Sequence, residues 1–372
     1  MAHEPYPIIS VRGDAYSRGY QHGSQAGELI RKNVEYYLHL WKTYSDMDRD
    51  YVLELAGKFV HPIEKYDGQI LRELEGVAAG AGISLEEVLA LNARYELVWA
   101  KLHEKREALQ SKVAECTSIA ANPQAASNGH TLIGQNWDYH VAVRDRCLML
   151  EIEQEDRPNI VIHTEAGIVG QKGMNSAGIG FCVNALLSEE DGFEPKVPFW
   201  VMCRGILNSE TLDEAQDAVL KADRSGSGNC LIASDGGEVV DLESTPKDVG
   251  VVSPVDGRLA HGNTFADLRE ERHLVDKFKA LYPHMPLRPS RAQALMARDP
   301  LDVEAFKEIL RDHDNAPESI CRHQDSQTSN GMAEESLTSI IMDLTDRVLY
   351  ITNGPPCQSE YKKLTFKNLK KG

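Results

Sequence analysis

The sequence predicts an α+β fold in which antiparallel β-sheet is covered by helices and preceded by a helical N-terminal part. The first hundred residues carry mostly helical hydrophobic periodicity, whereas the chain from Cys116 onward shows clusters of short strand patterns interrupted by helical pairs. The regular strand–helix alternation of a doubly wound parallel sheet is absent. No Gly-x-Gly-x-x-Gly follows a predicted strand, so a dinucleotide site is disfavoured.

The N-terminal part begins with a short predicted strand over residues 7–12. Helical periodicity then predicts helices over 24–45, 49–60, 66–80 and 84–98. Gly19 and Gly23 are four residues apart, which places them on one helix face where a second backbone can approach closely. A phosphate-binding loop is the alternative, but no Lys-Ser/Thr follows.

The chain from Cys116 begins with a predicted hairpin. Strand patterns over 116–122 and 131–139 flank Asn128-Gly129, a strong signal for a tight turn. The remaining predicted elements are strands at 147–154, 158–165, 168–174, 179–185, 229–234 and 238–243, extended structure over 248–263, helices at 197–208, 211–223, 266–282, 289–297 and 301–312, and a terminal hairpin turning at Thr345-Asp346.

The composition excludes several classes of function. The 372 residues carry a formal net charge of −17, which argues against nonspecific binding to nucleic acid or to an anionic membrane. No apolar run approaches the roughly 18 residues of a membrane span, and the N-terminus lacks the features of a secretory signal. The seven cysteines form no Cys-x-x-Cys pair and are typical of free thiols. We therefore expect an intracellular, cytoplasmic protein.

A metal site is one possibility for His313 and His323, which have Asp312, Asp314 and Asp325 beside them in the sequence. These residues span a loop without a helical i, i+4 pair of histidines. The sequence therefore predicts no metal ligands and no cofactor.

Cys116 stands where a charged segment, residues 103–112, meets the start of a predicted buried strand. It can be a core thiol or a nucleophile, and a nucleophile needs a base. The nearest downstream histidine is His130, but it lies in the predicted turn, so a Cys–His peptidase has no support from the sequence. The residue's own α-amine, with a pKa of about 7.7–8.0, is the other candidate base, provided that the chain is cut before Cys116.

The stretch Cys116-Thr117-Ser118, followed by Gly134-Gln135-Asn136-Trp137-Asp138, resembles the nucleophile region of the acyl-coenzyme A:6-aminopenicillanic acid acyltransferase family, the C45 peptidases among the N-terminal-nucleophile hydrolases. Similar features run along nearly the whole chain: Tyr16, Arg18, Gly19 and Gly23; Gly80-Ala81-Gly82; His261-Gly262-Asn263-Thr264-Phe265; Ser319-Ile320-Cys321-Arg322; Thr338-Ser339-Ile340-Ile341-Met342-Asp343; and Gly354-Pro355-Pro356-Cys357.

The resemblance implies a four-layer αββα sandwich and an autocatalytic cut between Glu115 and Cys116. The products would be a helical α chain of residues 1–115 and a catalytic β chain of residues 116–372, which together form one structural unit. This α/β heterodimer would come from one precursor, and a higher oligomer is left open. One departure stands out: Glu115 occupies a position where the family often has glycine, and a larger, charged residue can slow the self-attack.

The resemblance also implies roles for individual residues. Cys116 is expected to be the nucleophile with its amine as base, and Asp138 to orient or stabilise that charged centre. Asn263 matches the family's oxyanion-stabilising asparagine, a contribution often of about 3 kcal/mol. Arg322 matches an arginine that bears on processing and lowers the thiol pKa. From the residues alone, the alternatives are that Asp138 and Asn263 are turn residues and that Arg322 is part of a surface or structural ion pair.

We therefore expect a self-processing thiol amidohydrolase or acyltransferase that acts on a small N-acyl amide through an acyl-Cys116 thioester, without a cofactor. Water resolves this thioester in hydrolysis, whereas an amine does so in acyl transfer, with an acyl-thioester as a further conceivable co-substrate. Two alternatives remain from the sequence: an uncut, noncatalytic binding protein of the same fold, and a Cys–His peptidase.

Overall fold

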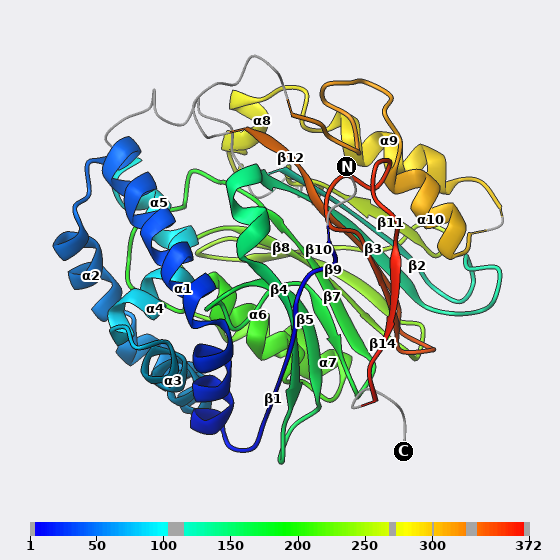
Figure 1. Ribbon diagram of the computed structural model, residues 1–372. Coiled ribbons are helices and arrows are strands. Elements are labelled where there is room, and N and C mark those ends of the chain that lie inside the picture. The colour runs from blue at the N-terminus through cyan, green and yellow to red at the C-terminus, as the bar shows by residue number, and fades with distance from the viewer. Residues whose placement is uncertain (1–3, 103–114, 268–272, 300, 325–332, 368–372) are drawn as a thin grey trace.

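Two β-sheets stack between helices in the computed structural model, which describes residues 4–102, 115–267, 273–299, 301–324 and 333–367 (Figure 1). Across these residues, one sheet has eight strands, in the spatial order β1 (Ile8–Arg12), β4 (Cys147–Glu153), β5 (Ile160–Glu165), β6 (Gly173–Asn175), β7 (Ile179–Ala185), β8 (Gly228–Ser234), β9 (Val239–Ser244) and β10 (Val249–Val252). The other described sheet has six, in the order β11 (Arg258–His261), β2 (Glu115–Ala121), β3 (Leu132–His140), β12 (Glu334–Asp343), β13 (Val348–Ile351) and β14 (Lys362–Thr365).

Helices cover the outer faces of both sheets (Figure 1). The N-terminal helices are α1 (Ala15–Ser45), α2 (Arg49–Gly57), α3 (Val60–Ala81), α4 (Leu85–Asn92) and α5 (Arg94–Leu102). The later ones are α6 (Phe199–Leu207), α7 (Leu212–Leu220), α8 (Lys277–Leu281), α9 (Leu287–Met296) and α10 (Val303–Leu310), with a 3₁₀ segment at Val141–Arg146. Phe199 of α6 lies against Gly228 of the eight-stranded sheet, and Phe306 of α10 packs with Ile119 and Leu132 of the six-stranded sheet. The predicted αββα arrangement is confirmed.

The close helix approach predicted from the glycine spacing is also confirmed, and it joins α1 to α3. A Cβ atom added at Gly19 would overlap the backbone carbonyl of Glu73, and one at Gly23 would overlap the backbone near residue 80. Gly76 and Gly80 face back in the same way, against the backbone of α1. The four glycines therefore let two helix backbones touch, and the phosphate-loop alternative is wrong.

Several predicted boundaries need correction. Helix α1 begins at Ala15 rather than at residue 24, because the Asp14 side chain accepts the backbone N–H of Ser17 and caps the helix there. Helix α3 begins at Val60 and contains a kink at Asp67. The predicted helix 84–98 is two helices, α4 and α5. Of the predicted helix 266–282, the described part is helical only in α8 and residues 268–272 are outside the described ranges.

The sheets differ from the prediction in two further respects. Strand β1 pairs in parallel with β4, so the larger sheet is not wholly antiparallel, although the other described pairings are antiparallel. Strand β14 was not predicted; it extends the terminal β12–β13 hairpin.

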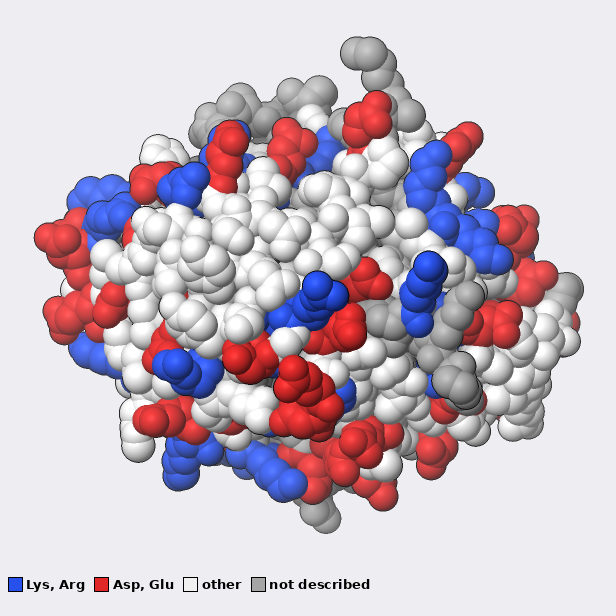
Figure 2. Space-filling view, turned by 60° about the horizontal axis from the view of Figure 1, so that its bottom comes forward, with Lys and Arg blue, Asp and Glu red and all other residues white. Residues whose placement is uncertain are grey.

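Within the described ranges, no helix combines the length and the apolar character of a membrane span. Figure 2 shows acidic and basic side chains interspersed on one face of the molecule.

Candidate active site

Cys116 is the second residue of β2, where it pairs with Trp137 of β3. Its side chain is buried. Burial and, to a smaller extent, the nearby charge of Asp138 raise the pKa of the thiol to about 12, against the opposing effect of Lys172 and Arg288. In the continuous chain the thiol is therefore protonated at neutral pH. The charged segment 103–112 lies outside the described residues.

Asn263 contacts the backbone of Cys116 directly. The N–H of Cys116 donates to Oδ1 of Asn263 at 2.7 Å, and Nδ2 of Asn263 donates to the carbonyl of Ala185 at 2.9 Å. The Asn263 side chain thus presents its oxygen, not its N–H, to Cys116. Its predicted role as an oxyanion donor stays a prediction. The loop is anchored by His261, whose Nε2 lies 2.7 Å from the Glu243 carboxylate.

Asp138 of β3 is fully buried beside Cys116 and lies opposite Glu115 in the strand register. Its carboxylate accepts the hydroxyl of Ser336 at 2.6 Å and forms an ion pair with Arg288 at 3.1 Å. Burial raises the pKa of Asp138 to about 6, although Arg288, Arg322 and the Ser336 hydroxyl act in the opposite direction. The alternative of a simple turn residue is wrong, because Asp138 lies within a strand and is paired with a buried cation.

Glu115, the residue that departs from the family pattern, has its own cationic pocket. Its carboxylate lies 2.6 Å from Nη2 of Arg288 and 2.8 Å from Nη1 of Arg322, with Nε2 of His284 at 3.8 Å. Glu115 is only 4% exposed. Burial alone would raise the pKa of Glu115, but Arg288, His284 and Arg322 lower it to about 2. The residue before the predicted cut is therefore a buried anion held by cations.

Arg322 is buried and lies beside Glu115 rather than in contact with the Cys116 thiol. Its guanidinium also lies 3.3 Å from the Glu318 carboxylate, and its backbone N–H donates to the hydroxyl of Ser336 at 2.9 Å. Because Ser336 donates in turn to Asp138, Arg322 is connected to the site through both its side chain and its backbone. Arg322 is therefore part of a structural ion pair, as the alternative expects, and its roles in processing and in lowering the thiol pKa stay predictions.

Sequence reasoning missed Arg288, which connects the site. From α9 it forms ion pairs with Glu115 and Asp138, and its Nη2 donates to Oδ1 of Asn263 at 3.3 Å. One signal was available: Arg288 stands four residues before the buried Ala292 of α9, so a charged side chain occupies the apolar face of that helix. Such a position needs a buried partner.

Lys172 was also missed. It is buried, and its Nζ lies 4.1 Å from the centre of the Trp137 ring. Burial lowers the pKa of Lys172 to about 8, although nearby thiols and a carboxylate act against this effect. A lone lysine in an irregular segment carries no periodic signal, so only the fold places it near the nucleophile.

His130, the histidine nearest to Cys116 in the downstream sequence, is too far from it to act as the base of a Cys–His peptidase. Strand β2 runs away from Cys116 to Ala121 before the turn that carries His130, a separation of more than about 15 Å at strand spacing. His130 instead binds the Asp343 carboxylate, with Nδ1 at 2.8 Å from it. Cys116 and His130 therefore do not form a catalytic dyad.

Comparison with known proteins identifies relatives. The profile of the family described as acyl-coenzyme A:6-aminopenicillanic acid acyl-transferase matches residues 125–358. The chain is 28% identical, over 364 residues, to the acyl-coenzyme A:6-aminopenicillanic-acid-acyltransferase 40 kDa form of Emericella nidulans, an alignment that covers 97% of this chain and 96% of the relative.

Among solved structures, the chain is similar to the C2A mutant of conjugated bile acid hydrolase from Clostridium perfringens, with 14% identity, a TM-score of 0.41, and coverage of 69% of this chain and 98% of the other. It is also similar to penicillin V acylase from Agrobacterium tumefaciens, with 11% identity, a TM-score of 0.40, and coverage of 69% and 88%.

The family profile spans more than half of the 372 residues, and the Emericella relative aligns over nearly the full length of both chains. On this basis, the chain belongs to the acyl-coenzyme A:6-aminopenicillanic acid acyltransferase family.

Proposed function

We propose that this protein is a self-processing cysteine amidohydrolase or acyltransferase that handles small N-acyl amides through an acyl-Cys116 thioester. The observation that carries the proposal is the hydrogen bond from the N–H of Cys116 to Asn263, next to a Glu115 side chain that is clamped by Arg288 and Arg322. The family profile begins at residue 125, after Cys116, so the choice of nucleophile rests on this geometry and on the sequence pattern.

The first reaction is the cut before Cys116. The thiol attacks the carbonyl carbon of Glu115 and passes its proton to the departing amide nitrogen. The C–N bond breaks, and the acyl group of Glu115 is left on sulfur as a thioester. Water then opens the thioester and releases a Glu115 carboxylate and the free Cys116 thiol. The buried ion pairs hold the Glu115 side chain in one position, which reduces the freedom of the peptide bond that must react.

The second reaction uses the new α-amine of Cys116. This nitrogen already lies 2.7 Å from Oδ1 of Asn263, so that the same oxygen can accept a hydrogen bond from the amine and fix its orientation. The amine takes the thiol proton as sulfur attacks the substrate carbonyl, and it returns the proton to the leaving amine. Asp138, buried nearby, would balance the positive charge that forms on the nitrogen.

Water or a second amine then resolves the acyl-Cys116 thioester. The Emericella relative is described by name as an acyltransferase acting with acyl-coenzyme A, which supports acyl transfer as one outcome. Hydrolysis has the simpler requirement, because transfer needs a site that holds an acceptor and excludes water. Turnover of N-acyl amines, β-lactams and β-alanyl amides, with and without added amines, would separate the two reactions.

Gel electrophoresis and N-terminal sequencing of the purified full chain test the proposal. We expect two polypeptides, the smaller ending at Glu115 and the larger beginning Cys-Thr-Ser-Ile. Cys116→Ala should give one band near 41.4 kDa, whereas Cys147→Ala, which removes another buried thiol, should leave the cut intact. A wild-type chain that stays whole and does not react with a thiol-directed acyl probe would instead support a noncatalytic binding protein.

A further inference from the structure

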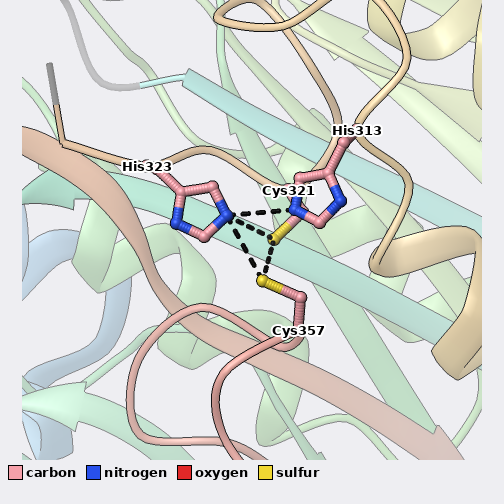
Figure 3. A group of neighbouring side chains, drawn as sticks. All are labelled: His313, Cys321, His323 and Cys357. Carbon is pink, nitrogen blue, oxygen red and sulfur yellow. Dashed lines mark hydrogen bonds between the residues drawn. The ribbon is translucent and has the colours of Figure 1, made fainter. Parts of the chain in front are cut away.

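Four side chains of types that can bind a metal ion converge near the surface (Figure 3). His313 follows α10, Cys321 and His323 precede β12, and Cys357 follows β13. Each offers one nitrogen or sulfur atom, and these four atoms all lie within 4.8 Å of one another. Figure 3 shows the two imidazoles and the two thiols pointing toward a common centre.

Four of the six separations between these atoms lie between 3.0 and 3.8 Å. The Nε2 atoms of His313 and His323 are 3.0 Å apart, and the sulfur atoms of Cys321 and Cys357 are 3.6 Å apart. Nε2 of His323 lies 3.2 Å from Cys357 Sγ and 3.8 Å from Cys321 Sγ. The sulfur atoms are too far apart for a disulfide, which needs about 2.05 Å.

These distances suit a tetrahedral zinc ion. Bonds of about 2.3 Å to sulfur and about 2.0–2.1 Å to nitrogen give ligand separations of roughly 3.8 Å between sulfurs, 3.3 Å between nitrogens and 3.6 Å between sulfur and nitrogen. Each of these four separations is within about 0.4 Å of that geometry. We propose that His313, Cys321, His323 and Cys357 form a structural Zn²⁺ site with two thiolate and two imidazole ligands.

The surroundings fit such a site. Cys321 is buried, whereas His313 and Cys357 are exposed, so an ion can enter from solvent. The amide group of Gln358 lies 3.4 Å from Nδ1 of His323, the ring nitrogen left over when Nε2 binds a metal. The sequence suggested Asp312, Asp314 and Asp325 as acidic companions of the histidines. Asp312 and Asp314 are instead paired with Arg291 at 2.9 and 3.4 Å, and Asp325 lies outside the described residues.

A bound ion would tie together two segments that are remote in sequence: residues 311–324, which follow α10, and the residues that follow β13. One of them carries Arg322 between two of the ligands, with its carbonyl accepting the N–H of Ser336 at 3.1 Å. Zinc binding would thus restrain the backbone on both sides of the arginine that pairs with Glu115. The site does not depend on the proposed function, because none of its ligands takes part in the cut or in the thioester chemistry.

Elemental analysis of the untagged full-length protein tests the proposal directly. We expect about one zinc per chain. Cys357→Ser and His323→Gln should each lower zinc affinity about tenfold or more, while His61→Gln, which removes an exposed histidine of α3, should not. Circular dichroism would verify that each variant is folded.

Cobalt titration of the metal-stripped wild-type protein provides a test that needs no variant. We expect absorption bands of tetrahedral Co²⁺ together with a thiolate charge-transfer band, both displaced by Zn²⁺. The proposal is overturned if the stripped wild-type chain binds neither ion, if zinc is retained equally by Cys357→Ser and His323→Gln, or if intact mass shows that freshly purified protein carries a Cys321–Cys357 disulfide.

Discussion

The residues that precede Cys116 are held in two different ways. Helices α1 and α3 touch through uncharged backbone at four glycines, beside a buried Arg18–Glu73 ion pair, whereas Glu115 is held mainly by buried cations. The glycine contact between the two helices is the same whether the peptide bond after Glu115 is intact or cut. The contact at Glu115 places a charged side chain against the bond that is predicted to break. Buried ion pairs such as Arg18–Glu73 and Arg204–Glu73 also occur in the helical part, but of these pairs only those of Glu115 lie at the bond that is expected to break.

The largest expected effect comes from Arg288→Met, because it leaves the Glu115 and Asp138 carboxylates without their shared buried cation. Removing one partner from such a group costs about 3–5 kcal/mol of unfolding free energy. The self-cut should fail as well. Urea unfolding and gel electrophoresis measure the two effects. Arg298→Met, which removes only a surface pair with Glu308, should change stability by less than about 1 kcal/mol.

Glu115→Gln should have the next largest effect. It keeps the shape of the side chain but removes the charge that pairs with Arg288 and Arg322. Charged hydrogen-bonded contacts of this kind contribute about 1.5–3 kcal/mol. We expect a loss of that order in the uncut Cys116→Ala background and a slower cut in the active chain. A faster cut would mean that the clamp hinders the self-attack rather than positioning the bond.

Gly76→Ala tests the uncharged contact. The new methyl group would overlap the backbone of α1 at Tyr16, and the helices would have to separate, at a cost of about 1–3 kcal/mol. The cut should proceed at its normal rate in the molecules that remain folded. Gly68→Ala in the same helix meets no neighbouring atom and should change stability by no more than about 1 kcal/mol. Equal losses from both variants would refute the close-contact explanation.

The smallest expected change, counted per pH unit, is the dependence of the unfolding free energy on pH through His261. Burial would lower the pKa of His261, but Asp241 and Glu243 raise it to about 9, above its ordinary value of 6.5. Its stabilising contribution is therefore complete below about pH 6.5 and is lost as the pH rises through about 9. A single proton gives at most about 1.4 kcal/mol per pH unit.

Urea unfolding at several pH values would show whether His261→Gln flattens this slope. The destabilisation by Gly76→Ala should stay constant over the same range, since no titrating group is added or removed there. A strong pH dependence of the Gly76→Ala effect would break the distinction between the two kinds of contact.

Local patterns in the sequence predicted the local features of the fold. The spacing of Gly19 and Gly23 predicted a close helix contact, and Asn128-Gly129 predicted the hairpin that brings Cys116 and Asp138 to neighbouring strand ends. The family and the αββα layers were also predicted correctly.

What the sequence did not predict depends on contacts between distant segments. Arg288 reaches Glu115 from a helix more than 170 residues away, and Cys357 meets His323 from another loop. Hydrophobic periodicity is a local signal and does not show which distant loops will lie side by side. The parallel pairing of β1 with β4 is of the same kind, because it joins the first strand of the chain to one that comes after Cys116.

That pairing has a consequence for assembly. If the chain is cut before Cys116, strand β1 belongs to one polypeptide and its neighbour β4 to the other, and the ladder from Ile8 to Arg12 becomes an intermolecular one. A separated fragment of residues 116–372 would expose the row of unpaired amides and carbonyls along β4, which is a ready template for aggregation. In that case we expect the chain to fold before it is cut, the two products to be purified together, and separately made fragments not to re-form the native structure when mixed.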